Sequence, residues 1–253
     1  MEEIKYFDCN CNFGMRGVID PGSFYKVEDL KKRMEHYGIS KALVYHSLAR
    51  EYSPMVGNAM LMDEIQKYPE FYPMWAVMPH HTNEFYTPSE LKEKLRINNV
   101  RAVCIFPGVN EQFFSTQNWI CGELFKMLES CKIPLFAGMT QLGFSEIARI
   151  CTEYPGLTII LTDLSYSIDR NLYGLLGSFK NLNIEISGYK VHNGIEEICE
   201  KFGADRMIFG SKMPEFSGGA AVSMVNYARI SDKEKQMIAH ENIEKLLEGV
   251  VLS

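Results

Sequence analysis

Polar side chains that can take part in acid–base or hydrogen-bonding chemistry occur directly after short apolar runs of this sequence. The first group is Asp8, Asn10 and Asn12, which alternate with Cys9 and Cys11. In an extended chain, successive side chains point to opposite faces. We therefore expect the three polar residues on one face, directed at a common site, and the two cysteines packed against helices on the other.

Later apolar runs are followed by residues with stronger acid–base chemistry. Histidine changes its charge near neutral pH and can serve as an acid, a base or a metal ligand. The candidate catalytic residues are Lys212, Asp163, Asn10, Asn12, His46 and His81. The candidate substrate-binding residues are Asp8, Phe106, Met139, Tyr189, His192 and Glu215. A lone histidine is more often packed or solvated than catalytic, so it is the grouping of these residues that suggests a site.

The elements that must position these residues are eight short β-rich runs that alternate with amphipathic, helix-like stretches. The runs are Ile4–Asp8, Lys41–Tyr45, Tyr72–Val77, Val100–Phe106, Pro134–Ala137, Leu157–Leu161, Leu182–Ile186 and Arg206–Phe209. Their first residues lie 23 to 37 positions apart, which leaves room for one helix after each strand. This alternation predicts an α/β fold with a parallel sheet.

Closure of eight such strands gives the predicted fold, a single-domain (β/α)8 TIM barrel over residues 1–253. The alternative is an open doubly wound sheet, which usually has fewer strands and a glycine-rich phosphate loop after the first. The segment DCNCNFG contains no such loop. In a barrel, the candidate residues would gather at the carboxyl-terminal ends of the strands, where barrel enzymes carry out their chemistry.

The composition excludes several classes of protein. Lys and Arg number 26 against 32 Asp and Glu, and a net charge of −6 argues against nucleic acid as a partner. No apolar run approaches the ~18 residues of a membrane helix, and the start at Met1 lacks a secretory leader pattern. The 7 cysteines, an odd number, suggest reduced thiols in a cytoplasmic protein. We expect a small-molecule substrate or ligand as the partner.

The sequence resembles the amidohydrolase-related family of metal-dependent hydrolases and decarboxylases over essentially its whole length. FGADRMIFGSKMPEFSGG resembles the family's last strand with its G-S-D-x-P pattern, and IAHENIEKLL resembles its closing helix. YFDCNCNFG stands where the family has D-x-H-x-H-x-G, and KIPLFAG and PGLTIILTDLSY resemble the strands that deliver two further histidines. The resemblance implies the barrel fold, hydrolase or decarboxylase activity, a zinc or manganese centre and, for many members, a homodimer.

The positions that match the family's metal ligands hold different residues in this chain. The resemblance puts two histidines on Asn10 and Asn12, two more on Gly138 and Asp163, and an aspartate on Lys212. Asparagine is a weak neutral ligand, and a charged lysine has no lone pair to offer. The nearby Cys-x-Cys pair has no second pair at zinc-site spacing. We therefore expect no metal and no other cofactor.

Lys212 can supply a positive charge where the family has its metal. If Asp163 lies within ion-pair reach, the two charges neutralise each other, and the polar residues of the first strand complete the hydrogen bonds. Lys212 can then act as a general acid, an electrostatic anchor or an amine nucleophile, with Asp163 or a histidine as the base. Glu215 is an alternative acidic partner, and the whole network can instead be an inert plug.

Three functions fit these observations. The preferred one is an amidohydrolase-related hydrolase or decarboxylase-like lyase that acts, with little or no metal, on a small carboxylated or cyclic compound. The alternatives are a catalytically inactive barrel that binds a small ligand, and a scaffold that uses its outer helices for assembly. The polar strand ends favour the first two, since a scaffold has no particular need for Lys212 and Asp163 at the metal position.

Overall fold

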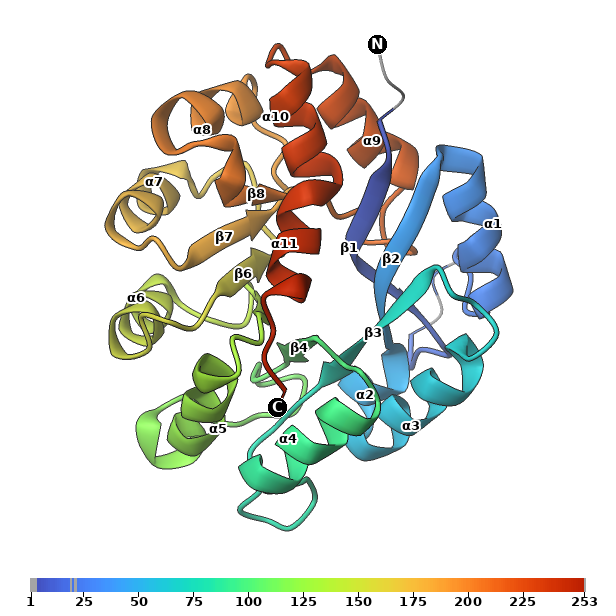
Figure 1. Cartoon of the computed structure of the whole chain (residues 1–253), viewed down its shortest axis with the longest axis vertical. Helices are drawn as coiled ribbons and strands as arrows, with labels where there is room; N and C mark the ends of the chain where they lie inside the picture. Colours follow the sequence, from blue (N-terminus) through green and yellow to red (C-terminus); the bar gives the residue numbers. More distant parts are fainter. Residues whose placement is uncertain (1–3, 19, 21, 253) are drawn as a thin grey trace.

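In the computed structural model, which describes residues 4–18, 20 and 22–252, eight parallel strands pair in chain order (Figure 1). They are β1 (Tyr6–Phe13), β2 (Ile39–His46), β3 (Phe71–Ala76), β4 (Ala102–Ile105), β5 (Leu135–Gly138), β6 (Ile159–Thr162), β7 (Leu182–Glu185) and β8 (Met207–Ile208). The N–H of Cys9 donates to the carbonyl of Phe209 (3.0 Å), which joins β1 to the residue after β8. The predicted (β/α)8 barrel is confirmed. The expectation that the sequence lacks a secretory leader concerns a segment that starts at residue 1, and residues 1–3 lie outside the described part of the chain.

Helices surround the strands, and α11 lies across them in the view of Figure 1. The helices are α1 (Val27–Tyr37), α2 (Ser47–Glu51), α3 (Pro54–Ile65), α4 (Pro88–Ile97), α5 (Asn118–Ser130), α6 (Phe144–Glu153), α7 (Asp169–Ser178), α8 (Gly194–Phe202), α9 (Gly218–Tyr227), α10 (Asp232–Gln236) and α11 (Asn242–Glu248). Within the described residues, no helix is long and apolar enough to cross a membrane.

Two apolar layers hold the fold together. Inside the barrel, Phe7, Met74 and Phe136 belong to one cluster of buried side chains. Leu30 and Leu124 belong to the larger layer between strands and helices. All five are nearly or completely buried. Burying a side chain of this size stabilises a fold by about 1.5–3 kcal/mol. Because the strands are covered on both faces, their sequences are almost continuously apolar.

Strand β1 departs from regular alternation. Its pairing with β2 shifts register between Asp8 and Cys11, as a β-bulge does. Cys9 packs with the side chains inside the barrel, whereas Cys11 packs in the layer beneath the helices. The prediction that both cysteines face the helices was therefore wrong for Cys9, because the bulge breaks the period of two.

Two connections differ from the expected single helix per strand. Between β2 and β3 the chain forms both α2 and α3, and the short α2 follows directly on the end of β2. The closing helix, expected as one piece, contains a π-helical turn over Met237–Glu241 between α10 and α11. The carbonyl of Ile238 in this turn accepts the N–H of Phe209 (2.9 Å), so the turn anchors the closing helix to the end of β8.

Candidate active site

A cavity of about 390 Å³ opens at the carboxyl-terminal ends of the strands. A narrow pocket of about 20 Å³ adjoins it, with Phe106 and Met74 among its apolar walls. Tyr45, Arg50 and Lys212 line both spaces, so the two form one hollow. A water molecule needs about 10–15 Å³ of such volume. The narrow part therefore admits only a small group, and the body of any ligand would occupy the wider part.

Lys212 and Asp163 form an ion pair in the narrow part of this hollow. Lys212 Nζ donates to Asp163 Oδ1, and only 22% and 13% of the two side chains are exposed. Gly138, at the end of β5, makes room for the carboxylate, because a Cβ there would lie 2.6 Å from Asp163 Oδ2. Lys212 Nζ also lies 5.1 Å from the ring centroid of Phe216. The ion pair considered from the sequence is thus present.

The backbone at both members of the pair is unusual. Asp163 has φ of 58° and Lys212 has φ of 56°, in the left-handed region that lysine rarely adopts. Such a residue costs of order 1–3 kcal/mol and persists only where its surroundings hold it. Here the N–H of Lys212 donates to the carbonyl of Asn10 (2.8 Å), which fixes the turn after β8 against β1.

Arg50, on α2, is the second cation of the hollow. Its Nε donates to Glu111 Oε1 (2.9 Å), and its guanidinium carbon lies 5.3 Å from the ring centroid of Phe106. Burial disfavours the charged form of Arg50, but bonds to Glu111 and Tyr45 outweigh burial, so its pKa is raised. Burial raises the pKa of the Tyr45 hydroxyl as well. Arg50 therefore stays a cation, and Tyr45 a neutral hydroxyl, throughout the physiological pH range.

A third cation, Arg16, comes from the loop after β1. It donates to Asn12 Oδ1 (2.7 Å) and pairs with Glu215 (2.7 Å). Asn12 Nδ2 in turn donates to Tyr45 Oη (3.2 Å) and to Glu215 Oε1 (3.2 Å). Asn12 and Glu215, both expected at the site, thus line the wider cavity in one polar network.

Glu185, the last residue of β7, is a completely buried carboxyl beside the narrow pocket. It accepts Asn10 Nδ2 (2.9 Å), Ser187 Oγ (2.8 Å) and the N–H of Ser187. Burial raises the pKa of Glu185 to about 7, although these hydrogen bonds favour its charged form. The hydrogen bond to Glu185 holds the side chain of Asn10, which lines the narrow pocket, in place.

Asp8 does not line the hollow. It is fully buried, and its Oδ1 accepts the backbone N–H groups of Asn10 (3.0 Å) and Ser211 (2.9 Å). Its Oδ2 has no hydrogen-bond partner among the described residues. Burial raises the pKa of Asp8 despite the donated bonds. Asp8 was expected among the ligand contacts, and the structure places it as a support between β1 and the turn after β8.

None of the three candidate histidines lines the hollow around Lys212. His46 is 2% exposed at the start of α2, where Nδ1 accepts the N–H of Leu48 (3.2 Å) and Nε2 lies 3.4 Å from Glu64. Burial lowers the pKa of His46, and it lines a separate hollow next to α3. His81 and His192 are exposed on loops and line none of the described parts of the main hollow.

The apolar candidates divide in the same way. Phe106 lines the narrow pocket as expected. Tyr189 is 1% exposed and donates to Asp169 (2.9 Å), so its ring belongs to the core rather than to the cavity wall. Met139 packs against the layer between strands and helices. The structure therefore brings together Lys212, Asp163, Asn10, Asn12, Phe106 and Glu215.

Five residues of the hollow and its supports were not predicted from the sequence: Arg16, Tyr45, Arg50, Glu111 and Glu185. Two of them have a sequence feature that could have identified them. Tyr45 ends a predicted strand, which is the position where barrel enzymes place functional groups. Glu185 is a charge inside an apolar run, and buried charges are rare without a partner. Loop residues such as Arg16 carry no comparable signal.

The sequence model of the amidohydrolase family matches residues 27–249 of this chain. The chain belongs to the amidohydrolase family. Among curated proteins, none matches the sequence.

Solved structures share the fold of this amidohydrolase-family chain. A TIM-barrel protein of uncharacterized function from Bordetella bronchiseptica superposes with a TM-score of 0.76 at 18% identity, covering 97% of this chain and 99% of its own. A 2,6-dihydroxybenzoate decarboxylase from Rhizobium gives 0.74 at 14%, covering 97% and 99%. A manganese-bound 5-carboxyvanillate decarboxylase from Novosphingobium aromaticivorans gives 0.76 at 16%, covering 97% and 97%. At these identities the likeness shows the fold.

The side chains present do not fit a divalent metal of the kind bound by the last of these structures. No group of three or more His, Cys, Asp or Glu side chains that could hold a metal ion occurs in the described ranges. The carboxylate of Asp163 is already engaged by Lys212, whose ammonium would repel a divalent cation. Asn10 and Asn12 offer only weak neutral oxygens.

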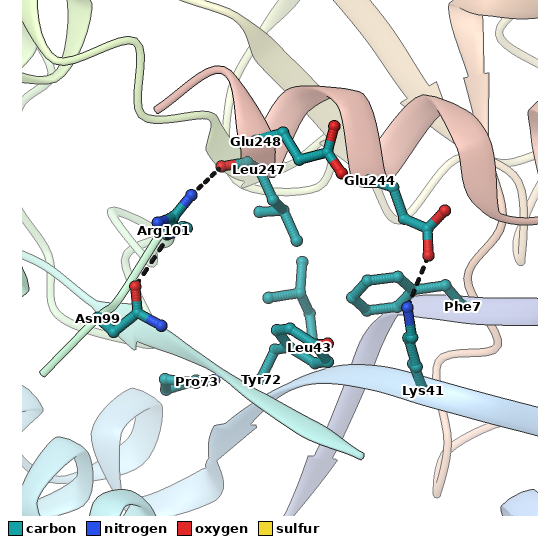
Figure 2. A pocket seen from close by; sticks show the side chains of 10 residues that line it. All are labelled: Phe7, Lys41, Leu43, Tyr72, Pro73, Asn99, Arg101, Glu244, Leu247 and Glu248. Carbon is teal, nitrogen blue, oxygen red and sulfur yellow. Dashed lines mark hydrogen bonds and ion pairs between the residues drawn. The ribbon is translucent and has the colours of Figure 1, made fainter. Parts of the chain in front are cut away.

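A second hollow, of about 240 Å³, lies at the opposite end of the barrel, between the starts of β1 and β3 and helix α11 (Figure 2). Phe7 and Leu247 contribute apolar walls. Both of its cations already have partners: Lys41 pairs with Glu244 (2.8 Å), and Arg101 donates to the carbonyl of Leu247 (3.1 Å).

Proposed function

We propose that this amidohydrolase-family protein is a metal-independent lyase or hydrolase, decarboxylase-like in its chemistry, that acts on a small carboxylated compound with a cyclic body. The observation that carries the proposal is the Lys212–Asp163 ion pair, which lines the narrow end of a cavity at the carboxyl-terminal ends of the strands. The partly buried Lys212 ammonium supplies the positive charge that a metal supplies elsewhere.

The charges of the hollow support a carboxylated substrate. Arg16, Arg50 and Lys212 line the wider cavity, and a guanidinium matches a carboxylate with two parallel hydrogen bonds. Acidic side chains line it as well (Asp20, Glu51, Glu111 and Glu215), so a substrate carboxylate would displace one of them from its cation. The apolar ring of Phe106 lies beside Arg50 and suits a cyclic substrate body. The names of the similar decarboxylases, for 2,6-dihydroxybenzoate and 5-carboxyvanillate, describe carboxylated ring compounds of this kind.

In the decarboxylation that we propose, the bond between the carboxylate carbon and the ring carbon breaks and carbon dioxide leaves. The electron pair of that bond stays on the ring carbon, where the Lys212 ammonium stabilises the negative charge and donates a proton to the same carbon. Asp163 orients the ammonium through its hydrogen bond to Nζ. The neutral amine then regains a proton from solvent, which completes the cycle.

The same pair suits a hydrolytic reaction. Asp163 would take a proton from the attacking water, and Lys212 would stabilise the oxyanion that forms on the substrate. The two reactions differ in their products, carbon dioxide in one and an acid with its leaving group in the other. Product analysis therefore distinguishes them.

A second candidate, a ligand-binding barrel without catalysis, is favoured by one observation. Each cation of the hollow is already neutralised, Lys212 by Asp163, Arg50 by Glu111 and Arg16 by Glu215. A ligand carboxylate would take the place of one of these acidic partners, and no covalent bond would be broken.

The test is carbon dioxide release from a panel of ring-hydroxylated benzoates, with protein dialysed against chelator. Binding of the same compounds is followed by calorimetry. We expect turnover that survives chelation and is lost in Lys212→Ala. Binding without turnover would contradict the proposed enzyme and favour the second candidate, a ligand-binding barrel. Turnover that appears only after manganese or zinc is added back would contradict metal independence.

A further inference from the structure

The side-chain amide of Asn10 has a nitrogen that donates hydrogen bonds and an oxygen that accepts them. Its Nδ2 donates to Glu185 Oε2 (2.9 Å), behind the wall of the hollow. Asn10 itself is 7% exposed and lines the narrow pocket together with Lys212. Among the described residues, no donor binds the amide oxygen Oδ1, and Oδ1 is not one of the fully buried side-chain atoms that lack a partner. It is therefore the accessible end of the amide in a residue that lines the narrow pocket.

Glu185 allows only this orientation while it is charged. A carboxylate accepts hydrogen bonds and donates none, so a reversed amide would bring two acceptor oxygens together. The same carboxylate accepts Ser187 Oγ (2.8 Å) and the N–H of Ser187, which fix its own position. It also occupies the space beside Gly210, where a Cβ would lie 2.4 Å from Oε1.

We propose that Glu185 is a positioning residue that fixes the Asn10 amide, so that the narrow pocket presents a carbonyl acceptor and favours ligands with a hydroxyl or amino donor at that point. The part concerning ligands rests on the proposed function, whereas the orientation of Asn10 does not. Glu185 need not touch the substrate for this effect.

Other titratable groups face Glu185 and must be separated from it in a test. Asp8 and Cys9 on β1 interact electrostatically with Glu185. Asp8 also accepts the backbone N–H of Asn10 (3.0 Å). A change that Asp8 causes would persist when Glu185 is replaced, and a change that Glu185 causes would not.

The experiment follows the side-chain amide of Asn10 by NMR in isotopically labelled protein without ligand. Its two proton resonances are identified by their absence in Asn10→Ser. In the wild type we expect nuclear Overhauser contacts to the Glu185 methylene protons and a clear shift between about pH 8.5 and about pH 5.5. Glu185→Gln should lose this shift. Asn58 is the internal control, because its Nδ2 donates to the carbonyl of Ala76 (2.8 Å) and should not move.

Ser187→Ala provides a second route if Glu185→Gln does not fold. It removes a hydroxyl donor to the Glu185 carboxylate, which disfavours the charged form and should move the midpoint of the Asn10 shift to higher pH. Missing contacts to Glu185 in the wild type, a shift that survives in Glu185→Gln, or an unmoved midpoint in Ser187→Ala would each overturn the proposal. None of these results depends on finding a substrate, so failure of the proposed activity is a separate outcome.

Discussion

The two ends of the barrel both carry hollows lined by lysine and arginine, yet the charges differ in their surroundings. At the carboxyl-terminal end, Lys212 and Asp163 are 22% and 13% exposed. At the amino-terminal end, Lys41 and Glu244 are 41% and 32% exposed. Water therefore screens the second pair more than the first.

This difference shows that a hollow with charged walls is not in itself a site. At the amino-terminal end, the walls are the starts of β1 and β3 with α11, whose packing stabilises the fold. At the carboxyl-terminal end, Lys212 is held in a left-handed backbone conformation, and the completely buried carboxyl of Glu185 binds Asn10 in the wall of the narrow pocket. Both features cost stability, and such costs are concentrated at functional sites.

The largest expected effect distinguishes the two lysines. Lys212→Ala should lower kcat/KM by about 10²–10³-fold, the usual cost of removing one group that stabilises developing charge. Lys41→Ala, the matched change at the other end, should leave kcat/KM unchanged. Both are measured as carbon dioxide release from the benzoate panel. Equal losses in the two variants would remove the distinction between the ends.

The next effect concerns stability rather than turnover. The pKa of Glu185 is raised to about 7 in the fold, above its ordinary value of 4.5, so the folded protein holds this proton more tightly than the unfolded chain. The contribution to stability is fully present below about pH 4.5 and declines as pH rises to about 7, by at most ~3 kcal/mol.

Urea unfolding of the wild type and Glu185→Gln across this range measures the effect. Their difference in unfolding free energy should shift in favour of Glu185→Gln as pH rises. A difference that does not change with pH would mean that Glu185 is ionised in the fold over the whole range.

A smaller effect is expected from the geometry of Arg50. Arg50→Lys keeps the charge but loses the planar fork, and should raise KM about tenfold with a smaller change in kcat. Arg101→Lys, at the opposite hollow, is the control and should change neither value. A drop in kcat at unchanged KM would instead indicate that Arg50 stabilises the transition state.

The smallest effect is the stability contribution of the amino-terminal ion pair. Exposed pairs contribute about 0–1 kcal/mol, so Lys41→Ala should change the free energy of unfolding by less than about 1 kcal/mol. Thermal or urea unfolding at low and high salt measures it. A loss of several kcal/mol would show that this end also depends on a buried charge.

The fold was predictable because most strands are short apolar runs separated by enough residues for a helix, and such runs are local features of the sequence. The predicted run Leu182–Ile186 matches β7 (Leu182–Glu185) almost residue for residue. The bulge in β1 was not predictable, since register against β2 depends on contacts far away in sequence. Short α2 was missed because the spacing of strands suggests one helix per connection.

The candidate site was predictable in part, where polar side chains follow the ends of strands. Lys212 and Asp163 follow β8 and β6, and the structure pairs them. His81 and His192 also follow strands, but their loops carry them into solvent, which strand position alone does not reveal. Arg50 could not be found because α2 was not expected. The cytoplasmic location, the single-domain organisation and the homodimer stay predictions.

The most direct measurement of the central claim is elemental analysis of the purified protein. It should be produced with added zinc and manganese, and never be exposed to a chelator or an affinity metal. Metal independence predicts a content far below one ion per chain, with carbon dioxide release unaffected by chelation. A tightly held content of about one ion per chain, removed by chelator together with the activity, would contradict it.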